Sequence, residues 1–123
     1  MYKFLTHDAR GSVLRIALNR PEVFNAFHRG MALELQQALA EADRNPEVRA
    51  VLLTGEGRAF CSGQDLSEAI DPQGPGLDRI LSEHYNPLVL QIRSIRKPVV
   101  VAVNGVAAGA GANLALAGDV VLA

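Results

Sequence analysis

Two short runs of apolar residues constrain the fold of this chain more than any other feature of its sequence. One lies within Arg49–Thr54, and the other is the valine-rich segment Pro98–Val103. Short apolar runs of this kind are typical of strands in a parallel sheet that is covered on both faces. A third segment, Val13–Leu18, alternates in polarity and predicts a strand with one wetter face. We therefore expect a sheet with mostly parallel pairing.

Apolar residues at helical spacing separate these strands. The segment Met31–Ala42 predicts a helix with a polar outer face, which Asn45 and Pro46 should end. Helical spacing recurs within Leu77–Ile95, where Pro87 should kink or divide the helix. The small and apolar residues of Gly109–Ala117 predict a short helix that is buried all round. Strands that alternate with helices indicate an α/β domain.

Length and composition exclude several classes of protein. A chain of 123 residues fits one domain, residues 1–123, and a net charge of -1 gives no overall field that would attract nucleic acid or an acidic membrane. We expect no membrane span and no signal peptide, because polar residues interrupt the apolar stretches at both ends. The three histidines show no metal-ligand spacing. The lone Cys61 cannot form an internal disulfide, which favours a cytoplasmic location.

Two loops are the natural candidates for a functional site, because each follows a buried strand and is rich in small residues. They lie around Ser62–Asp65 and Gly105–Gly111. Ligands of open α/β sheets bind beyond the carboxyl ends of the strands. The second loop leads into a helix whose free N–H groups would suit a developing oxyanion. The alternative interpretation is that the glycines only permit tight turns and close packing.

Other candidate chemistries find weaker support. A dinucleotide site is disfavoured because Leu114 occupies the third glycine position of the motif. Cys61 could pair with a histidine as a nucleophile, but we expect it to be a small buried hydrophobe, and we expect His28 and His84 to be solvated. Asp65 could be an acid, although a helix cap with Glu68 completing a capping box is the favoured interpretation.

Three motifs carry a resemblance to a known family. They are Asn19-Arg20-Pro21-Glu22 with Asn25-Ala26, Gly57 to Leu66, and Lys97-Pro98 with Ala102 to Gly111. In this order and spacing they resemble the crotonase, or enoyl-CoA hydratase/isomerase, superfamily. The resemblance covers essentially the whole chain. Within the superfamily, Tyr85-Asn86-Pro87-Leu88-Val89 and three other segments are most similar to isomerases of phenylacetate degradation.

The resemblance implies a spiral of ββα units, of which this chain is the N-terminal portion. It also implies a coenzyme A thioester as substrate with no separate cofactor, and assembly as homotrimers or hexamers. The thioester carbonyl would be polarised by the backbone N–H groups of Gln64 and Ala110. The residues implied to hold coenzyme A or the substrate are Ala26, Ser62, Gly63, Asp65, Leu66 and Gly109.

One position departs from the pattern of the hydratases. Asn113 stands where they carry the first of two glutamates, and an amide can orient a group but cannot act as a general acid or base. An isomerase, which needs one acid or base, is therefore favoured, with that residue expected beyond Ala123. The alternatives are an enoyl-CoA hydratase or hydrolase of the same fold and a non-catalytic acyl-CoA binding protein.

Overall fold

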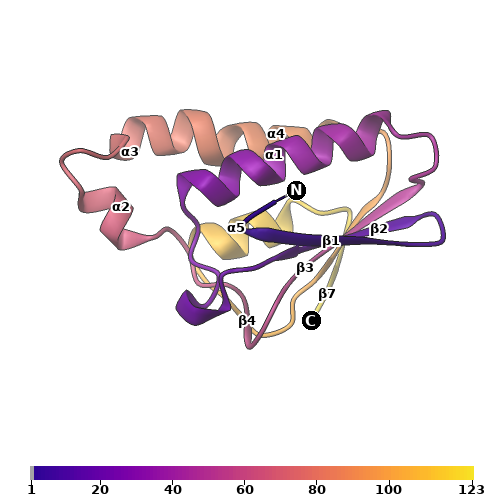
Figure 1. Cartoon of the computed structure of the whole chain (residues 1–123), viewed down its shortest axis with the longest axis horizontal. Helices are drawn as coiled ribbons and strands as arrows, with labels where there is room; N and C mark the ends of the chain where they lie inside the picture. Colours follow the sequence, from indigo (N-terminus) through magenta and orange to yellow (C-terminus); the bar gives the residue numbers. More distant parts are fainter. Residues whose placement is uncertain (1) are drawn as a thin grey trace.

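The computed structural model describes residues 2–123, apart from the side chain of Leu77, and arranges them as three successive ββα units (Figure 1). In chain order the elements are β1 (Leu5–Arg10), β2 (Val13–Leu18), the 3-10 turn η1 (Pro21–Val23), α1 (Arg29–Arg44), β3 (Ala50–Gly55), β4 (Ala59–Cys61), α2 (Leu66–Ile70), α3 (Gly76–Arg79), the π-helical segment η2 (Ile80–Tyr85), α4 (Asn86–Ser94), β5 (Val99–Ala102), β6 (Val106–Ala107), α5 (Ala110–Leu116) and β7 (Val120–Leu122).

The strands form two sheets. The main sheet has the order β1-β2-β3-β5-β7, in which β1 pairs antiparallel with β2 and the remaining neighbours pair in parallel. The short strands β4 and β6 pair in parallel as a separate sheet. In the second and third units, one strand thus joins the main sheet and the next joins the small one. This arrangement confirms the α/β fold and the spiral of ββα units.

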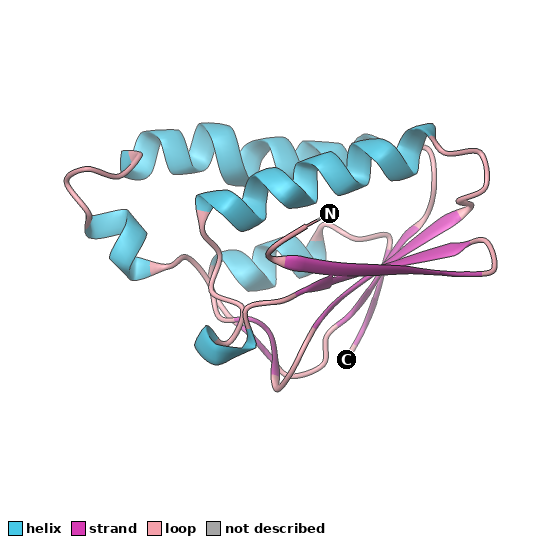
Figure 2. Cartoon of the chain, in the orientation of Figure 1, coloured by secondary structure: helices cyan, strands magenta, loops and turns pink. Residues whose placement is uncertain are grey.

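The helices lie on one side of the main sheet (Figure 2). Val51 and Leu53 of β3 and Val99 and Val101 of β5 point to this side and are fully buried. Leu52, on the other face, is only half-buried. The expectation that both faces would be covered is therefore wrong for residues 2–123, because the described helices pack on one face only.

Helix α1 follows the predicted pattern. Its inward residues are almost completely buried, and they are Met31, Ala32, Leu35, Ala38, Leu39 and Ala42. His28 caps its first turn, since the ring Nδ1 accepts from the N–H of Met31 at 3.2 Å. Asn45 leaves the helical conformation immediately before Pro46, as predicted. Helix α1 packs lengthwise against α4 (Figure 1).

The segment before Pro87 widens into a π-helix. Pro87 has no N–H to give to the carbonyl of Glu83, four residues earlier. The side chain of Gln36, from α1, donates to that carbonyl at 2.6 Å. The backbone stays helical at Tyr85 and Asn86, so Pro87 marks a change of helix type here and does not divide the helix.

Helix α5 corrects one prediction. Gly111, Leu114 and Ala115 are buried, but Asn113 is exposed and Leu116 is 70% exposed. Burial all round is therefore wrong, because only the face toward β4 and β6 is covered. No helix within residues 2–123 is long and apolar enough to cross a membrane.

Candidate active site

A cavity of about 450 Å³ lies between the loop after β4, the η2–α4 helix and the start of α5. Its lining residues are Gln64, Ile80, Leu81, Tyr85, Asn86, Val89, Gly109, Ala110, Asn113 and Leu114. The two loops singled out by the sequence therefore meet at one cavity. Four predicted site residues line it: Gln64, Gly109, Ala110 and Asn113.

The peptide unit between Gly63 and Gln64 is held by Phe27. The carbonyl oxygen of Gly63 accepts from the N–H of Phe27 at 2.7 Å, and the N–H of Asp65 donates to the carbonyl of Phe27 at 2.8 Å. In a trans peptide the C=O and N–H point in opposite directions. The N–H of Gln64 is therefore directed away from Phe27, and it finds no acceptor within residues 2–123.

The peptide unit between Gly109 and Ala110 is held in the same manner. The carbonyl of Gly109 accepts from the N–H of Asn113 at 3.2 Å. Ala110 is the first residue of α5, so its N–H is one of the groups without a partner inside the helix. It also finds no acceptor within the described part of the chain. Both free N–H groups thus belong to residues that line the cavity, which suits a carbonyl oxygen that gains negative charge.

Both of these peptide units follow a glycine with positive φ. Gly63 has a φ of 113°, and Gly109 combines a φ of 52° with a ψ of -123°, conformations that residues with a side chain rarely adopt. A Cβ at Gly63 would also lie 3.2 Å from the carbonyl oxygen of Ala108. Glycine is therefore required at both positions by the backbone that aims the following N–H.

The side chain of Gln64 is anchored at both of its polar ends. Its Oε1 accepts from the hydroxyl of Tyr85 at 2.6 Å, and its Nε2 donates to Glu68 at 3.3 Å and to the carbonyl of Asp65 at 3.2 Å. Burial, with the neighbouring Cys61 and Glu68, raises the pKa of Tyr85 above its usual range. The phenol therefore keeps its proton and acts as a donor.

Asp65 is a helix cap, as favoured from the sequence. Its Oδ1 accepts from the N–H of Ser67 at 2.9 Å and from that of Glu68 at 3.4 Å. Its Oδ2 lies 3.3 Å from the guanidinium of Arg20. The prediction that Glu68 completes a capping box, by accepting from the N–H of Asp65, is wrong. The carboxylate of Glu68 accepts from the N–H of Arg29 instead, at 3.0 and 3.1 Å.

Asn113 lines the cavity with an exposed side chain. Its amide cannot exchange a proton with a substrate near neutral pH. Among the lining residues that the structure describes, Tyr85 alone has a titratable side chain. The described wall of the cavity therefore stabilises charge better than it moves protons.

The other residues assigned to coenzyme A lie outside the cavity. Ser62 is exposed, and its N–H donates to Phe24 at 3.0 Å. Leu66 is 73% exposed at the start of α2, and the carbonyl of Ala26 accepts from Arg20 at 2.6 Å. The segment after η1 pairs with the loop after β4, through the bridge between Phe27 and Gln64 and the bond from Ser62 to Phe24.

Two predictions about histidine are wrong. His84, within the η2 segment, is fully buried, and burial lowers its pKa. His28 is half-buried as the cap of α1, with its ring 4.4 Å from that of Phe4. Helix edges predict exposure only where nothing packs over them, and here the packing partners are distant in sequence. Cys61 is a buried thiol as expected, and burial raises its pKa.

Six lining residues were not foreseen as site residues: Ile80, Leu81, Tyr85, Asn86, Val89 and Leu114. Leu81, Tyr85 and Val89 recur every four residues, which would have placed them on one helix face. These three residues and Ile80 form most of the apolar wall, which runs from η2 into α4.

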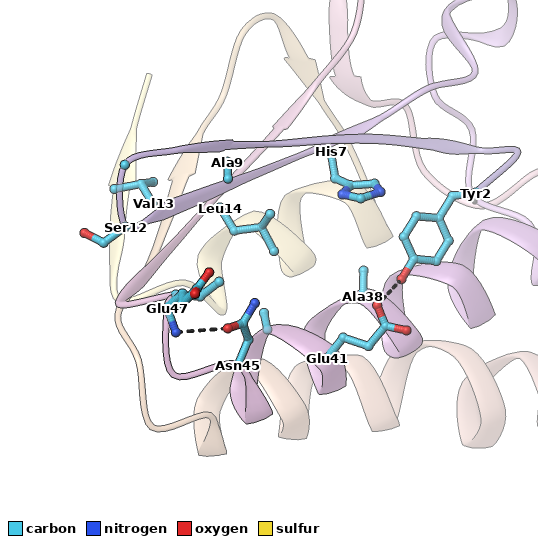
Figure 3. A pocket seen from close by; sticks show the side chains of 13 residues that line it. Tyr2, His7, Ala9, Ser12, Val13, Leu14, Ala38, Glu41, Asn45 and Glu47 are labelled. Atoms are coloured by element: carbon cyan, nitrogen blue, oxygen red, sulfur yellow. Dashed lines mark hydrogen bonds between the residues drawn. The ribbon is translucent and has the colours of Figure 1, made fainter.

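A second cavity, of about 200 Å³, lies beside the C-terminal half of α1 and under the β1–β2 hairpin (Figure 3). At its edge, the hydroxyl of Tyr2 donates to Glu41 at 3.0 Å. None of the predicted site residues lines it. Among residues 2–123, no cluster of three or more His, Cys, Asp or Glu side chains is placed to hold a metal ion.

The fold and the cavity together define a class: an α/β protein of ββα repeats with two free backbone N–H groups at one pocket. The family model for enoyl-CoA hydratase/isomerase matches residues 8–123. The chain therefore belongs to the enoyl-CoA hydratase/isomerase family, the crotonase superfamily.

Individual relatives agree with this assignment. The chain is 47% identical to the 1,2-epoxyphenylacetyl-CoA isomerase of Escherichia coli (strain K12), over 100% of this chain and 48% of the relative. It is 50% identical to a probable enoyl-CoA hydratase of Rhodobacter capsulatus, over 99% of this chain and 46% of the relative. The crystal structure of an enoyl-CoA hydratase/isomerase from Xanthobacter autotrophicus Py2 superposes with a TM-score of 0.90 at 31% identity, covering 98% of this chain and 46% of that one. The chain thus spans about half the length of the relatives it matches.

Proposed function

We propose that the protein binds acyl-CoA thioesters and isomerises them through an enolate. The observation that carries this proposal is the pair of N–H groups of Gln64 and Ala110, both at one cavity and both without an acceptor in the described chain. When a proton leaves the carbon next to a thioester, negative charge moves to the carbonyl oxygen. Two preorganised donors stabilise that oxygen, and one such donor contributes about 3 kcal/mol to the transition state.

An isomerase fits the described cavity better than a hydratase does. Moving a double bond from C3 to C2 requires removal of a proton from C2 and return of a proton to C4, so one acid-base group suffices. Hydration by two carboxylates would require a second one, and Asn113 does not supply it. We propose that the proton carrier lies outside residues 1–123.

The finer proposal is an isomerase of aromatic degradation, which converts ring-1,2-epoxyphenylacetyl-CoA to its oxepin isomer. The 47% identity to the E. coli isomerase supports it. The 50% identity to the probable hydratase of R. capsulatus supports the second candidate, an enoyl-CoA hydratase. A non-catalytic acyl-CoA binding protein is a third possibility, which measured turnover would eliminate.

The full-length protein separates these functions by its products. Given a 3-enoyl-CoA, an isomerase should yield the 2-enoyl isomer, as followed by chromatography of the thioesters. Given crotonyl-CoA, it should add water slowly or not at all. Efficient hydration of crotonyl-CoA would overturn the role given to Asn113 and favour the hydratase.

Coenzyme A itself provides a test of the binding half of the proposal. We propose that the thioester is the substrate and that no separate cofactor takes part. We also propose that the protein is a cytoplasmic homotrimer or hexamer, as the family resemblance implies. Coenzyme A should raise the melting temperature of the protein, because a ligand that binds only the folded state stabilises it. An unchanged melting temperature at saturating coenzyme A would contradict acyl-CoA binding.

A further inference from the structure

We propose that Tyr85 is a positioning residue for the oxyanion hole. Through the side chain of Gln64, it holds the peptide unit between Gly63 and Gln64 so that the N–H of Gln64 stays directed into the cavity. This inference rests on the proposed function. In this role Tyr85 contacts Gln64 and does not contact the substrate.

The peptide unit in question needs outside restraint. Gly63 has no side chain and a φ of 113°, so its own torsional preferences restrict the following peptide weakly. A rotation of that peptide would turn the N–H of Gln64 away from a bound oxygen. The first restraint is the hydrogen bond from Phe27 to the carbonyl of Gly63.

The second restraint acts on the side chain of Gln64. The Tyr85 hydroxyl donates to its Oε1 at 2.6 Å, the shortest of the bonds that anchor this amide. On the other side, Nε2 donates to Glu68, whose carboxylate is fixed by the N–H of Arg29 at the start of α1. Gln64 is therefore tied to two helices, and of these bonds the one from Tyr85 connects it to the helix that forms the apolar wall.

Tyr85 is itself well placed to act as an anchor. It is the last residue of the π-helical segment, a rare conformation that often accompanies functional sites. Its ring packs against that of Phe27, with centroids 5.4 Å apart. Phe27 thus holds the peptide of Gln64 by its backbone and supports Tyr85 by its ring, so both restraints meet at one residue.

The hydroxyl of Tyr85 donates its hydrogen bond to Gln64, so a direct role of this hydroxyl as acid or donor to the substrate is the weaker interpretation. Burial also keeps the phenol protonated across the working pH range. The ring still lines the cavity, so loss of the whole side chain would mix positioning with packing. The informative change is Tyr85→Phe, which removes the hydroxyl and keeps the ring.

The experiment uses acetoacetyl-CoA and the full-length protein. The enolate of this β-keto thioester absorbs in the near ultraviolet, so the bound enolate fraction reports on the oxyanion hole without turnover. Four proteins are compared with the wild type: Tyr85→Phe, Gln64→Met, the double variant, and Tyr2→Phe as a matched control at the remote cavity. Melting curves show that each variant is folded.

Tyr85→Phe should weaken binding of the enolate form about three- to tenfold, as expected for one hydrogen bond, and should leave the affinity for coenzyme A unchanged. Tyr2→Phe should change neither. In the Gln64→Met background, Tyr85→Phe should have no further effect, because its partner is already gone. Full-length kinetics should show the same loss in kcat with little change in KM.

Two results would overturn the inference while leaving the proposed function intact: an unchanged enolate fraction in Tyr85→Phe, or losses that multiply in the double variant. The second result would mean that Tyr85 contacts the ligand directly. Failure of the wild type to increase the enolate fraction of acetoacetyl-CoA would instead overturn the proposed function, and the role of Tyr85 with it.

Discussion

Gly111 of α5 lies directly against the carbonyl of Cys61 in β4. A Cβ at Gly111 would overlap that carbonyl group and would come within 2.9 Å of the Cβ of Cys61. The close approach places the first turn of α5, and with it the free N–H of Ala110, against the small β4–β6 sheet. Glycine at 111 therefore controls the position of one half of the proposed oxyanion hole.

Gly111→Ala should destabilise the protein. The helix would have to move away from β4, since a backbone carbonyl cannot yield as a flexible side chain can, and overpacking of this kind costs about 1–3 kcal/mol. Urea unfolding measures the loss. The neighbouring Ala112→Ser, at a half-exposed position, should change stability by less than about 0.5 kcal/mol. Equal effects of the two substitutions would show that the contact is unimportant.

The elements that were predicted correctly are those whose signal is local. Periodicity placed α1 and β2, because their buried faces repeat at 3.6 or 2 residues. Continuous apolar runs placed β3 and β5. Strand β1 was missed, since Leu5–Arg10 is mostly polar and is held by antiparallel pairing with β2. Strands β4 and β6 were missed because each is too short to carry a pattern.

The features of the site also differ in whether a local sequence signal predicts them. Its N–H donors follow from glycine-rich loops at strand ends, and the family resemblance placed them at Gln64 and Ala110. The apolar wall and the bond from Tyr85 depend on packing of residues more than 15 positions away in the chain, which one sequence does not encode locally. The exposure of Asn113 and the burial of His84 were misjudged for the same reason: both are set by neighbouring elements.

Ala110→Pro should abolish most of the proposed isomerase activity of the full-length protein. Proline deletes the N–H donor but is tolerated in the first turn of a helix, where this N–H makes no intrahelical bond. Loss of one oxyanion donor lowers kcat by about 100- to 1000-fold. Steady-state kinetics with a 3-enoyl-CoA measure the loss. Ala110→Gly keeps the N–H and serves as the control, so similar losses in both variants would argue against a role for this donor.

Two substitutions of Asp65 distinguish the stability that comes from its helix-capping bonds from the stability that comes from its ion pair with Arg20. Asp65→Ala removes the acceptor for the N–H groups of Ser67 and Glu68 and should cost about 1 kcal/mol of stability. Asp65→Asn keeps a capping oxygen and loses only the ion pair with Arg20, so it should remain closer to the wild type. Denaturant unfolding of both variants tests this order. A larger loss in Asp65→Asn would mean that the pair with Arg20 is the principal contribution.

The burial of His84 should make stability depend on pH below about 6.5. Burial and the cation of Arg29 favour the neutral ring and outweigh the opposing charges of Glu68 and Glu83, so the pKa of His84 falls below its ordinary value of 6.5 in the folded protein. On acidification the unfolded chain therefore takes up this proton first. The stabilisation is complete above pH 6.5 and is lost as the pH falls toward the folded-state pKa.

Thermal unfolding from pH 8 to pH 5 tests this dependence. The wild type should lose stability across the lower half of the range, and His84→Leu should lose less, because its side chain has no proton to gain. Some slope should remain, since burial also lowers the pKa of His28. Glu83 affects stability at more acidic pH. Its bonds to Arg79 and Arg29 lower its pKa from 4.5 to about 2, so the stabilisation that depends on its charge is lost only below pH 4.5. Identical slopes for the wild type and His84→Leu between pH 6.5 and pH 5 would show that His84 accepts a proton in the folded state as readily as in the unfolded chain.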